Sequence, residues 1–178
     1  MTEPRLRADA RRNRDRVLAA AREAFAEGGF AVPLDDIAAR AGVGPGTVYR
    51  HFPTKESLFQ SVVSARVTDL VADARRRAAA DADPGGAFFG FLAHLGAEAA
   101  AKRDTSDAIS VPGPLRQAMH DAIDALLTRA QAAGAVKAGV SAADLVVFLK
   151  SLLAAVHDDP DPGRAERLLA VLTDGLRP

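Results

Sequence analysis

The segment Leu34–Phe52 constrains the fold most, because its residue pattern predicts two short helices joined by a tight turn. We expect the first helix to span Leu34–Ala41, with Gly42 ending it in the left-handed conformation that glycine adopts without strain. The second helix is expected to begin at Pro45, since proline suits a first helical position, with Gly44 as its N-cap. The segment is therefore predicted to be a helix-turn-helix unit.

Helical periodicity divides the second of these helices into two faces. At about 100 degrees per residue, Val48 and Phe52 fall on one side. We expect them to pack on the preceding helix, against Ile37, Ala38 and Ala41. The apolar side therefore fixes the second helix in place and leaves its other side for a partner.

The other side and its flanks carry groups that suit double-stranded DNA. Arg50 can make a bidentate contact with guanine, and Thr47 can contact a neighbouring base through its methyl or hydroxyl group. Gly46 has no side chain, so its expected use is a close approach of the backbone to DNA. Tyr49 and His51 project to the flanks, where they would meet phosphates, which position a protein without specifying sequence.

The segment Asp35–Phe59 resembles the DNA-binding segment of the tetracycline-repressor (TetR/AcrR) transcription regulators, over about the first third of the chain. The run Thr-x-Tyr-x-His-Phe followed by Pro-Thr-Lys-Glu carries the resemblance. It implies that the second helix is the recognition helix, with phosphate contacts from Tyr49, His51 and Lys55 and groove contacts from Pro45, Gly46, Thr47 and Arg50.

The chain departs from this family at Val32-Pro33, where the family usually has a pair of threonines. The hydroxyl cap and phosphate contact of such a pair are not expected here. An alternative for the whole segment is a helical hairpin without a ligand, because glycine turns between helices are common connections.

The net charge of the chain argues against DNA binding, whereas the local distribution of charge favours it. The net charge of the 178-residue chain is zero, but six arginines fall within the first sixteen residues. Local charge sets the potential that phosphate meets. We expect residues 1–8 to form a mobile basic arm that follows the DNA backbone or enters the minor groove. The alternative is a solvated tail.

The remaining sequence predicts helices with almost no strand signal. A first helix is expected from Ala10 to Glu27, capped by Asp9, and a long helix from Lys55 to about Ala82, capped by Thr54. Further helices are expected at 86–102, 114–133, 142–157 and 163–176. The predicted fold is all-α, with a helix-turn-helix domain at 9–60 joined by the long helix to a helical domain at 61–178.

The second domain contains two candidate functional regions. Apolar residues with a few polar groups are typical of ligand pockets but equally of a bundle core. The candidate effector pocket comprises Phe88, Phe91, Leu92, His94, Leu95, Gln117, Met119, His120, Ile123 and Leu127. The last two helices resemble the family's dimer-forming pair, although a buried position within the monomer is the alternative. The candidate interface residues are Leu145, Phe148, Leu149, Leu152, Leu168 and Leu172.

Composition and motifs narrow the class of protein. The chain has no cysteine and no apolar run long enough to span a membrane, and no secretory signal is apparent, so we expect a cytoplasmic protein. No cofactor or metal is expected: His94 with Glu98, and His120 with Asp124, are spaced for two metal ligands but more commonly form a surface ion pair or a lone polar contact.

No enzyme signature is present. The sequence thus predicts a homodimeric DNA-binding regulator, most simply a repressor released from a palindromic operator by an unidentified small-molecule effector. The alternatives are a helical small-molecule-binding or interaction protein that has lost specific DNA binding, and an architectural DNA-binding protein without an effector.

Overall fold

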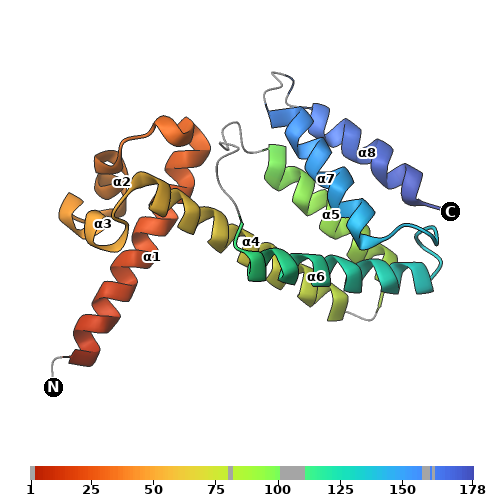
Figure 1. The fold of residues 1–178 in the computed structure, drawn as a ribbon, viewed down its shortest axis with the longest axis horizontal. Coiled ribbons are helices and arrows are strands. Elements are labelled where there is room, and N and C mark those ends of the chain that lie inside the picture. Colours follow the sequence, from red (N-terminus) through yellow and green to blue (C-terminus); the bar gives the residue numbers. More distant parts are fainter. Residues whose placement is uncertain (1–2, 80–81, 101–110, 158–160, 162) are drawn as a thin grey trace. The chain divides into compact units, whose positions relative to one another are not determined.

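The protein is all-α in a computed structural model that describes residues 3–79, 82–100, 111–157, 161 and 163–178. Within these residues the structure contains eight α-helices, one 3-10 helix and no strand (Figure 1). Contacts divide the chain into two compact units, with the boundary inside α4 (Lys55–Ala79), between Ala65 and Arg66. The expected fold class is confirmed.

The first unit forms a core from the apolar faces of its short helices. It contains α1 (Glu3–Gly28), η1 (Gly29–Ala31), α2 (Leu34–Ala41), α3 (Pro45–His51) and the first turns of α4. Burying a large apolar side chain contributes about 1.5–3 kcal/mol. The buried members are Val17, Ala20, Ala21, Ala24, Phe25, Leu34, Ile37, Ala38, Ala41, Val48, Phe52, Leu58, Phe59 and Val62.

Helix α1 begins earlier than the sequence predicts. It starts at Glu3 rather than Ala10, so the expected cap by Asp9 is wrong and the chain from residue 3 to residue 8 is helical. Pro4 is compatible with this start because proline is tolerated in the first turn of a helix. Asp9 instead accepts a hydrogen bond from Arg12, one turn further along. Residues 1–2 of the expected arm, and the side chains before Ala8, lie outside the described residues.

The second unit contains the rest of α4, then α5 (Pro84–Ala100), α6 (Gly113–Ala132), α7 (Ala142–His157) and α8 (Arg164–Leu176). Gly134 and Gly139, which follow α6, have positive φ angles of 69° and 96°, as turns after a helix require. The buried core is formed by Val71, Ala74, Phe88, Phe91, Leu92, Ala122, Ile123, Leu126, Leu127, Ala130, Val136, Leu145, Val146, Leu149, Leu169 and Leu176.

Close packing in the second unit depends on a small residue at one crossing. Helices α5 and α8 meet at Gly96, where a Cβ atom would collide with the buried side chain of Leu169.

No helix in the described part of the chain is long and apolar enough to cross a membrane. The same residues include no group of three or more histidine, aspartate or glutamate side chains that could hold a metal ion.

Candidate nucleic-acid interface

The turn between α2 and α3 has the predicted geometry. Gly42 has φ 63° and ψ 38°, and its N–H bonds to the carbonyl oxygen of Ala39 at 3.0 Å, which ends α2. Gly44 is extended at φ −70° and ψ 149° and precedes Pro45, the first residue of α3. The left-handed glycine and the N-terminal proline therefore set the angle at which α3 leaves the turn.

Helix α3 has one fully buried side and one exposed side, as its periodicity predicts. Val48 is 0% exposed and Phe52, directly after the helix, is 2% exposed, and both belong to the core that contains Ile37. By contrast, Tyr49 is 49% exposed although it is a large aromatic residue. Arg50, beside it, is also exposed. The buried side holds α3 against the core. The exposed aromatic residue and arginine on its other side form a surface suited to a partner.

The seven predicted DNA-contact residues all have solvent access. Pro45, Gly46, Tyr49 and Arg50 are exposed, whereas Thr47, His51 and Lys55 are half-buried. A Cβ atom on Gly46 would have no atom within 4 Å, so no packing within the protein requires glycine there. These residues form one short stretch of chain, from the start of α3 to the start of α4.

The beginning of α4 is fixed by a reciprocal cap. The N–H of Ser57 donates to Thr54 Oγ1 at 3.1 Å, and the N–H of Thr54 donates to Ser57 Oγ at 3.2 Å. The predicted cap by Thr54 is therefore confirmed. Lys55 Nζ lies 4.8 Å from the centre of the Phe30 ring, which orients its charge at the helix N-terminus. A cation at the positive end of a helix dipole suits an anion such as phosphate.

The start of α2 lacks a side-chain cap, as the missing threonine pair leads one to expect. Pro33 takes the N-cap position in an extended conformation, with no side-chain hydrogen bond to the helix. Its carbonyl oxygen accepts from the N–H of Ile37 at 3.3 Å. Neither Val32 nor Pro33 has a hydroxyl group that could bind a phosphate at this position.

Two arginines of α1 support the helix-turn-helix segment and were not identified from the sequence. The Arg14 guanidinium carbon lies 5.3 Å from the centre of the Phe52 ring, and Arg16 donates to the carbonyl oxygen of Gly42 at 3.2 Å. Helical spacing contains a signal for Arg14, which precedes the buried Val17 by three residues and Ala21 by seven. Such spacing places it on the side of α1 that faces the core.

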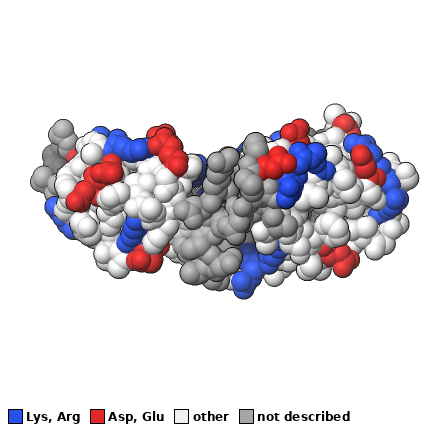
Figure 2. All heavy atoms as spheres, turned by 90° about the horizontal axis from the view of Figure 1, so that it is seen from above, with Lys and Arg blue, Asp and Glu red and all other residues white. Residues whose placement is uncertain are grey.

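Charges of both signs are mixed on the surface. On the face drawn in Figure 2, basic and acidic side chains alternate and neither sign forms a continuous patch. Arg40, for example, donates to Glu27 at 2.6 Å, and this contact raises the pKa of Arg40. Attraction to DNA would therefore depend on local groups rather than on the net charge.

The candidate effector-pocket residues divide into core and surface positions. Phe88, Phe91, Leu92, Ile123 and Leu127 are at most 3% exposed and belong to the core of the second unit, where Leu95 and Met119 pack partly buried against them. On the same helices, His94 and His120 are half-buried, and Gln117 is exposed and donates to Asp121 at 2.9 Å. The candidate pocket residues of α5 and α6 thus lie close together, but the apolar ones among them are packed in the core.

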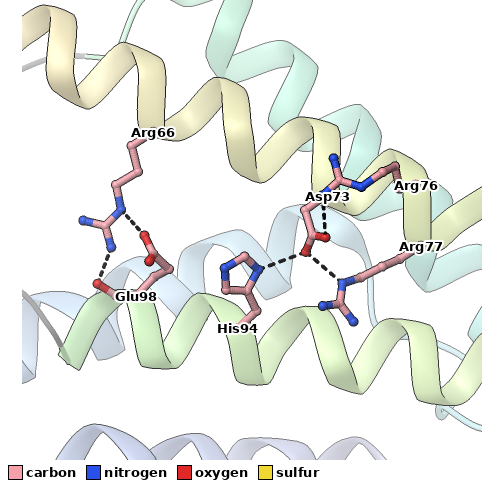
Figure 3. A network of polar contacts seen from close by, with 6 residues as sticks. All are labelled: Arg66, Asp73, Arg76, Arg77, His94 and Glu98. Carbon is pink, nitrogen blue, oxygen red and sulfur yellow. Dashed lines mark hydrogen bonds and ion pairs between the residues drawn. The ribbon is translucent and has the colours of Figure 1, made fainter. Parts of the chain in front are cut away.

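A network of polar contacts joins α4 to α5 (Figure 3). Asp73 is 13% exposed on its side chain and bonds to Arg77 at 2.8 Å, to His94 at 2.9 Å and to Arg76 at 3.0 Å. Burial opposes its ionisation, but hydrogen bonds from Arg77 and His94 outweigh burial and hold the pKa of Asp73 below its ordinary value. His94 thus makes a polar contact with Asp73, and the expected alternative of an ion pair with Glu98 is wrong because Glu98 binds Arg66 at 2.6 Å.

An open apolar groove of about 830 Å³ lies along α7 and α8. Of the candidate interface residues, Leu145, Phe148, Leu152, Leu168 and Leu172 line it, whereas Leu149 is buried in the core. Val147 is 64%, Phe148 59% and Val171 72% exposed. None of the ten candidate pocket residues lines this groove. An exposed apolar surface of this kind is typical of an interaction site.

The two units define a helix-turn-helix protein with a separate helical bundle. Comparison with known proteins supports this class of protein. A family model described as "Bacterial regulatory proteins, tetR family" matches residues 17–62, and one described as "Transcriptional regulator SbtR-like, C-terminal domain" matches residues 83–178. The chain belongs to the TetR family of bacterial regulatory proteins.

Individual relatives extend this result to the whole fold. A TetR transcription regulatory protein from Mycobacterium vanbaalenii is 40% identical, with a TM-score of 0.73, over 97% of this chain and 99% of that one. The regulator UidR of Escherichia coli is 39% identical over 33% of this chain and 30% of its own length. The activator FasR of Mycolicibacterium smegmatis is 35% identical over 46% and 41%. The matches thus span less than half of these two curated relatives.

Proposed function

We propose that the protein is a homodimeric transcriptional regulator that binds a palindromic DNA site through α3 and is released from it by a small molecule. The exposed Tyr49–Arg50 side of α3, opposite the buried Val48 and Phe52, is the observation that carries the DNA-binding part. Pro45, Gly46, Thr47 and Arg50 would contact the major groove. Tyr49, His51 and Lys55 would contact phosphates on its two sides.

Dimerisation is supported by the groove along α7 and α8. Phe148 and Val171 are more than half exposed beside the inward-facing Leu145 and Leu152, so the apolar surface continues from the core to solvent. We propose that a second copy covers it through a two-fold axis, which buries the same residues on both copies. Two recognition helices related by such an axis would contact the two halves of a palindrome.

Release by an effector is supported by the connection between α4 and α5. We propose that the ligand binds among the candidate residues of α5 and α6, where Phe88, Phe91 and Ile123 would have to separate because they are packed. Movement of α5 would be transmitted to α4 through Asp73 and His94, which are bonded at 2.9 Å. The ligand would lower DNA affinity by as much as it prefers the altered arrangement. Such a protein would act without catalysis, in the bacterial cytoplasm, where the DNA lies.

The test begins with selection of bound duplexes from a random pool, followed by fluorescence anisotropy of the selected duplex and a scrambled one. The wild-type protein should prefer the selected duplex. Arg50→Ala should weaken that binding by about 1–3 kcal/mol and relax the preference at one base position in each half-site. Arg116→Ala, on the exposed surface of α6, is the matched control and should change neither quantity.

A rival function is favoured by the missing threonine pair and the zero net charge. A helical small-molecule-binding or interaction protein would bind both duplexes weakly and equally. An equal loss of affinity for every sequence in Arg50→Ala would instead make Arg50 a phosphate contact. A reporter gene placed behind the selected site distinguishes repression from activation, which is relevant because one relative is named an activator.

Effector release is tested by screening small apolar molecules for two simultaneous effects. A true effector should raise the melting temperature, because it binds the folded protein, and should weaken binding to the selected duplex. A molecule that stabilises the protein and leaves DNA affinity unchanged binds without regulating. If every stabilising molecule behaves in that way, an architectural DNA-binding function without an effector is the better description.

A further inference from the structure

The first fourteen residues of α1 extend beyond the core of the first unit. Among the described side chains of this helix, none before Val17 is buried. Figure 1 shows the N-terminal turns of α1 projecting past α2 and α3. A helix segment that buries few side chains gains little stability from packing, which supplies most helical stability in proteins. The described side chains from Ala8 to Arg16 are exposed or half-buried, and most are therefore open to a partner.

Arg14 connects this projecting segment to Phe52, the residue directly after the recognition helix. Its guanidinium carbon lies 5.3 Å from the centre of the Phe52 ring, and the ring of His51 lies 6.3 Å from the same ring. Phe52 is buried, whereas Arg14 is exposed. A guanidinium held over a ring keeps N–H groups at its edge, and these can bind a phosphate in a fixed orientation.

Arg11 continues the same side of α1 away from Phe52. It is exposed and lies three residues before Arg14, so the two arginines are neighbours on the helix surface, about 4.5 Å apart along its axis. In the described part of the chain neither forms an ion pair with a carboxylate, whereas Arg12, on another side of α1, is bonded to Asp9. Arg11 and Arg14 thus retain charge that an anion can use.

We propose that Arg11 and Arg14, here called the α1 arginine pair, bind the DNA phosphate backbone beside the recognition helix and lengthen its contact with the duplex. The proposal rests on the proposed contact between α3 and DNA, and it adds residues that a recognition helix alone does not supply. The position of Arg14 beside Phe52, the residue directly after the recognition helix, and the charge of the pair identify the partner as nucleic-acid backbone. The contact is independent of base sequence.

The salt dependence of binding tests this directly, because each phosphate contact contributes about 0.9 to the slope of log affinity against log salt concentration. In a dimer, Arg14→Gln or Arg11→Gln should each reduce the slope by about 1.8 and the double variant by about 3.6, on the selected and the scrambled duplex alike. Affinity at low salt should fall about tenfold or more for the double variant, while the preference between the two duplexes is kept.

Control variants separate the pair from general charge. Arg12→Gln removes the same charge from the same helix but from a residue bonded to Asp9, and it should leave the slope nearly unchanged. Asp15→Asn removes the exposed acidic neighbour of Arg11 and should strengthen binding. Melting temperatures, measured for all variants, identify any loss of folding caused by losing the contact between Arg14 and Phe52.

The outcomes distinguish this inference from the proposed function. Unchanged slopes in the α1 arginine pair variants, or an equal change in Arg12→Gln, would overturn the inference. Arg50→Ala should show the opposite pattern, with lost preference between the duplexes and a nearly unchanged slope. A wild-type protein that binds neither duplex would overturn the proposed function together with the inference.

Discussion

Helix α3 and the helix pair α7–α8 both leave one face uncovered, but the chemistry of the two faces differs. The outer side of α3 carries Tyr49 and Arg50, groups that can hydrogen-bond, while the α7–α8 surface carries Val147, Phe148 and Val171. Water solvates the first face well and the second poorly. The comparison indicates that the first is suited to a hydrated, charged partner and the second to a protein surface.

The two ends of α4 show a related difference. Its beginning contributes Leu58, Phe59 and Val62 to an entirely apolar core in the first unit. Its later part is connected to α5 by the ion pair between Arg66 and Glu98, by the hydrogen bond between Asp73 and His94, and by apolar packing. Polar contacts depend on geometry and protonation more than apolar burial does, so the α5 end of the helix is better suited to respond to a ligand.

The largest expected effect comes from placing a charge in the α7–α8 groove. Val171→Asp should raise the dissociation constant of the dimer by about a hundredfold, or about 2.7 kcal/mol, because the two-fold axis would bury two unpaired carboxylates. Sedimentation equilibrium over a range of protein concentrations measures this constant. The melting temperature at high dilution, where both proteins are monomeric, should be unchanged because Val171 is exposed in the single chain.

Ala170→Asp is the matched control for this substitution. Ala170 is exposed on α8, next to Val171 in the sequence, but does not line the groove. The control should dimerise like the wild-type protein. A hundredfold change in both variants would mean that added charge on α8 acts at any position, and an unchanged constant in Val171→Asp would remove the groove from the dimer interface.

A smaller effect is expected at Asp73, which connects the later part of α4 to α5 through polar contacts. Asp73→Asn should destabilise the protein by about 1–2 kcal/mol at pH 7, since it weakens charge-assisted hydrogen bonds whose partners are partly exposed. The pKa of Asp73 is lowered in the folded protein, so its ionised form stabilises the fold above the ordinary aspartate pKa of about 4. That contribution disappears as the pH falls through the folded-state pKa.

Urea denaturation at a series of pH values measures this contribution. The difference between wild type and Asp73→Asn should be constant near neutral pH and should shrink below about pH 4. Asp124→Asn, an exposed position on α6, controls for the loss of a carboxylate. A difference between wild type and Asp73→Asn that stays constant down to pH 2 would show that the amide loses packing or geometry rather than charge.

Local patterns predicted the first unit better than the second. The spacing of Val48 and Phe52 determines the buried side of α3, and Gly42 determines the turn, because both effects operate within a few residues. The partner of His94 could not be predicted in this way, since Asp73 lies 21 residues away on another helix. The start of α1 was missed for a different reason: Asp9 is a good cap by type, but an earlier start with Pro4 in the first turn was also allowed.

The candidate sites show the same limit. A strongly apolar helix such as α7 is expected to be buried on several sides. The sequence does not show which of these sides is buried within the single chain and which is left for a second copy. The structure buries Leu145 and Leu149 and leaves Val147 and Phe148 exposed. The contact of Arg14 with Phe52 was likewise missed, because it depends on how α1 crosses the segment after α3.

The smallest expected effect is at Gly46 and tests how closely α3 approaches its partner. Gly46→Ala should stabilise the first unit by about 0.5–1 kcal/mol, because alanine favours a helix and its Cβ atom would meet no atom within 4 Å. If the backbone of α3 lies against DNA, the added methyl group should nevertheless reduce affinity for the selected duplex about tenfold. Higher melting temperature with weaker binding would therefore be the signature of a glycine retained for its partner. An unchanged affinity would mean that Arg50 and Thr47 reach the bases from a helix that stands further from the groove.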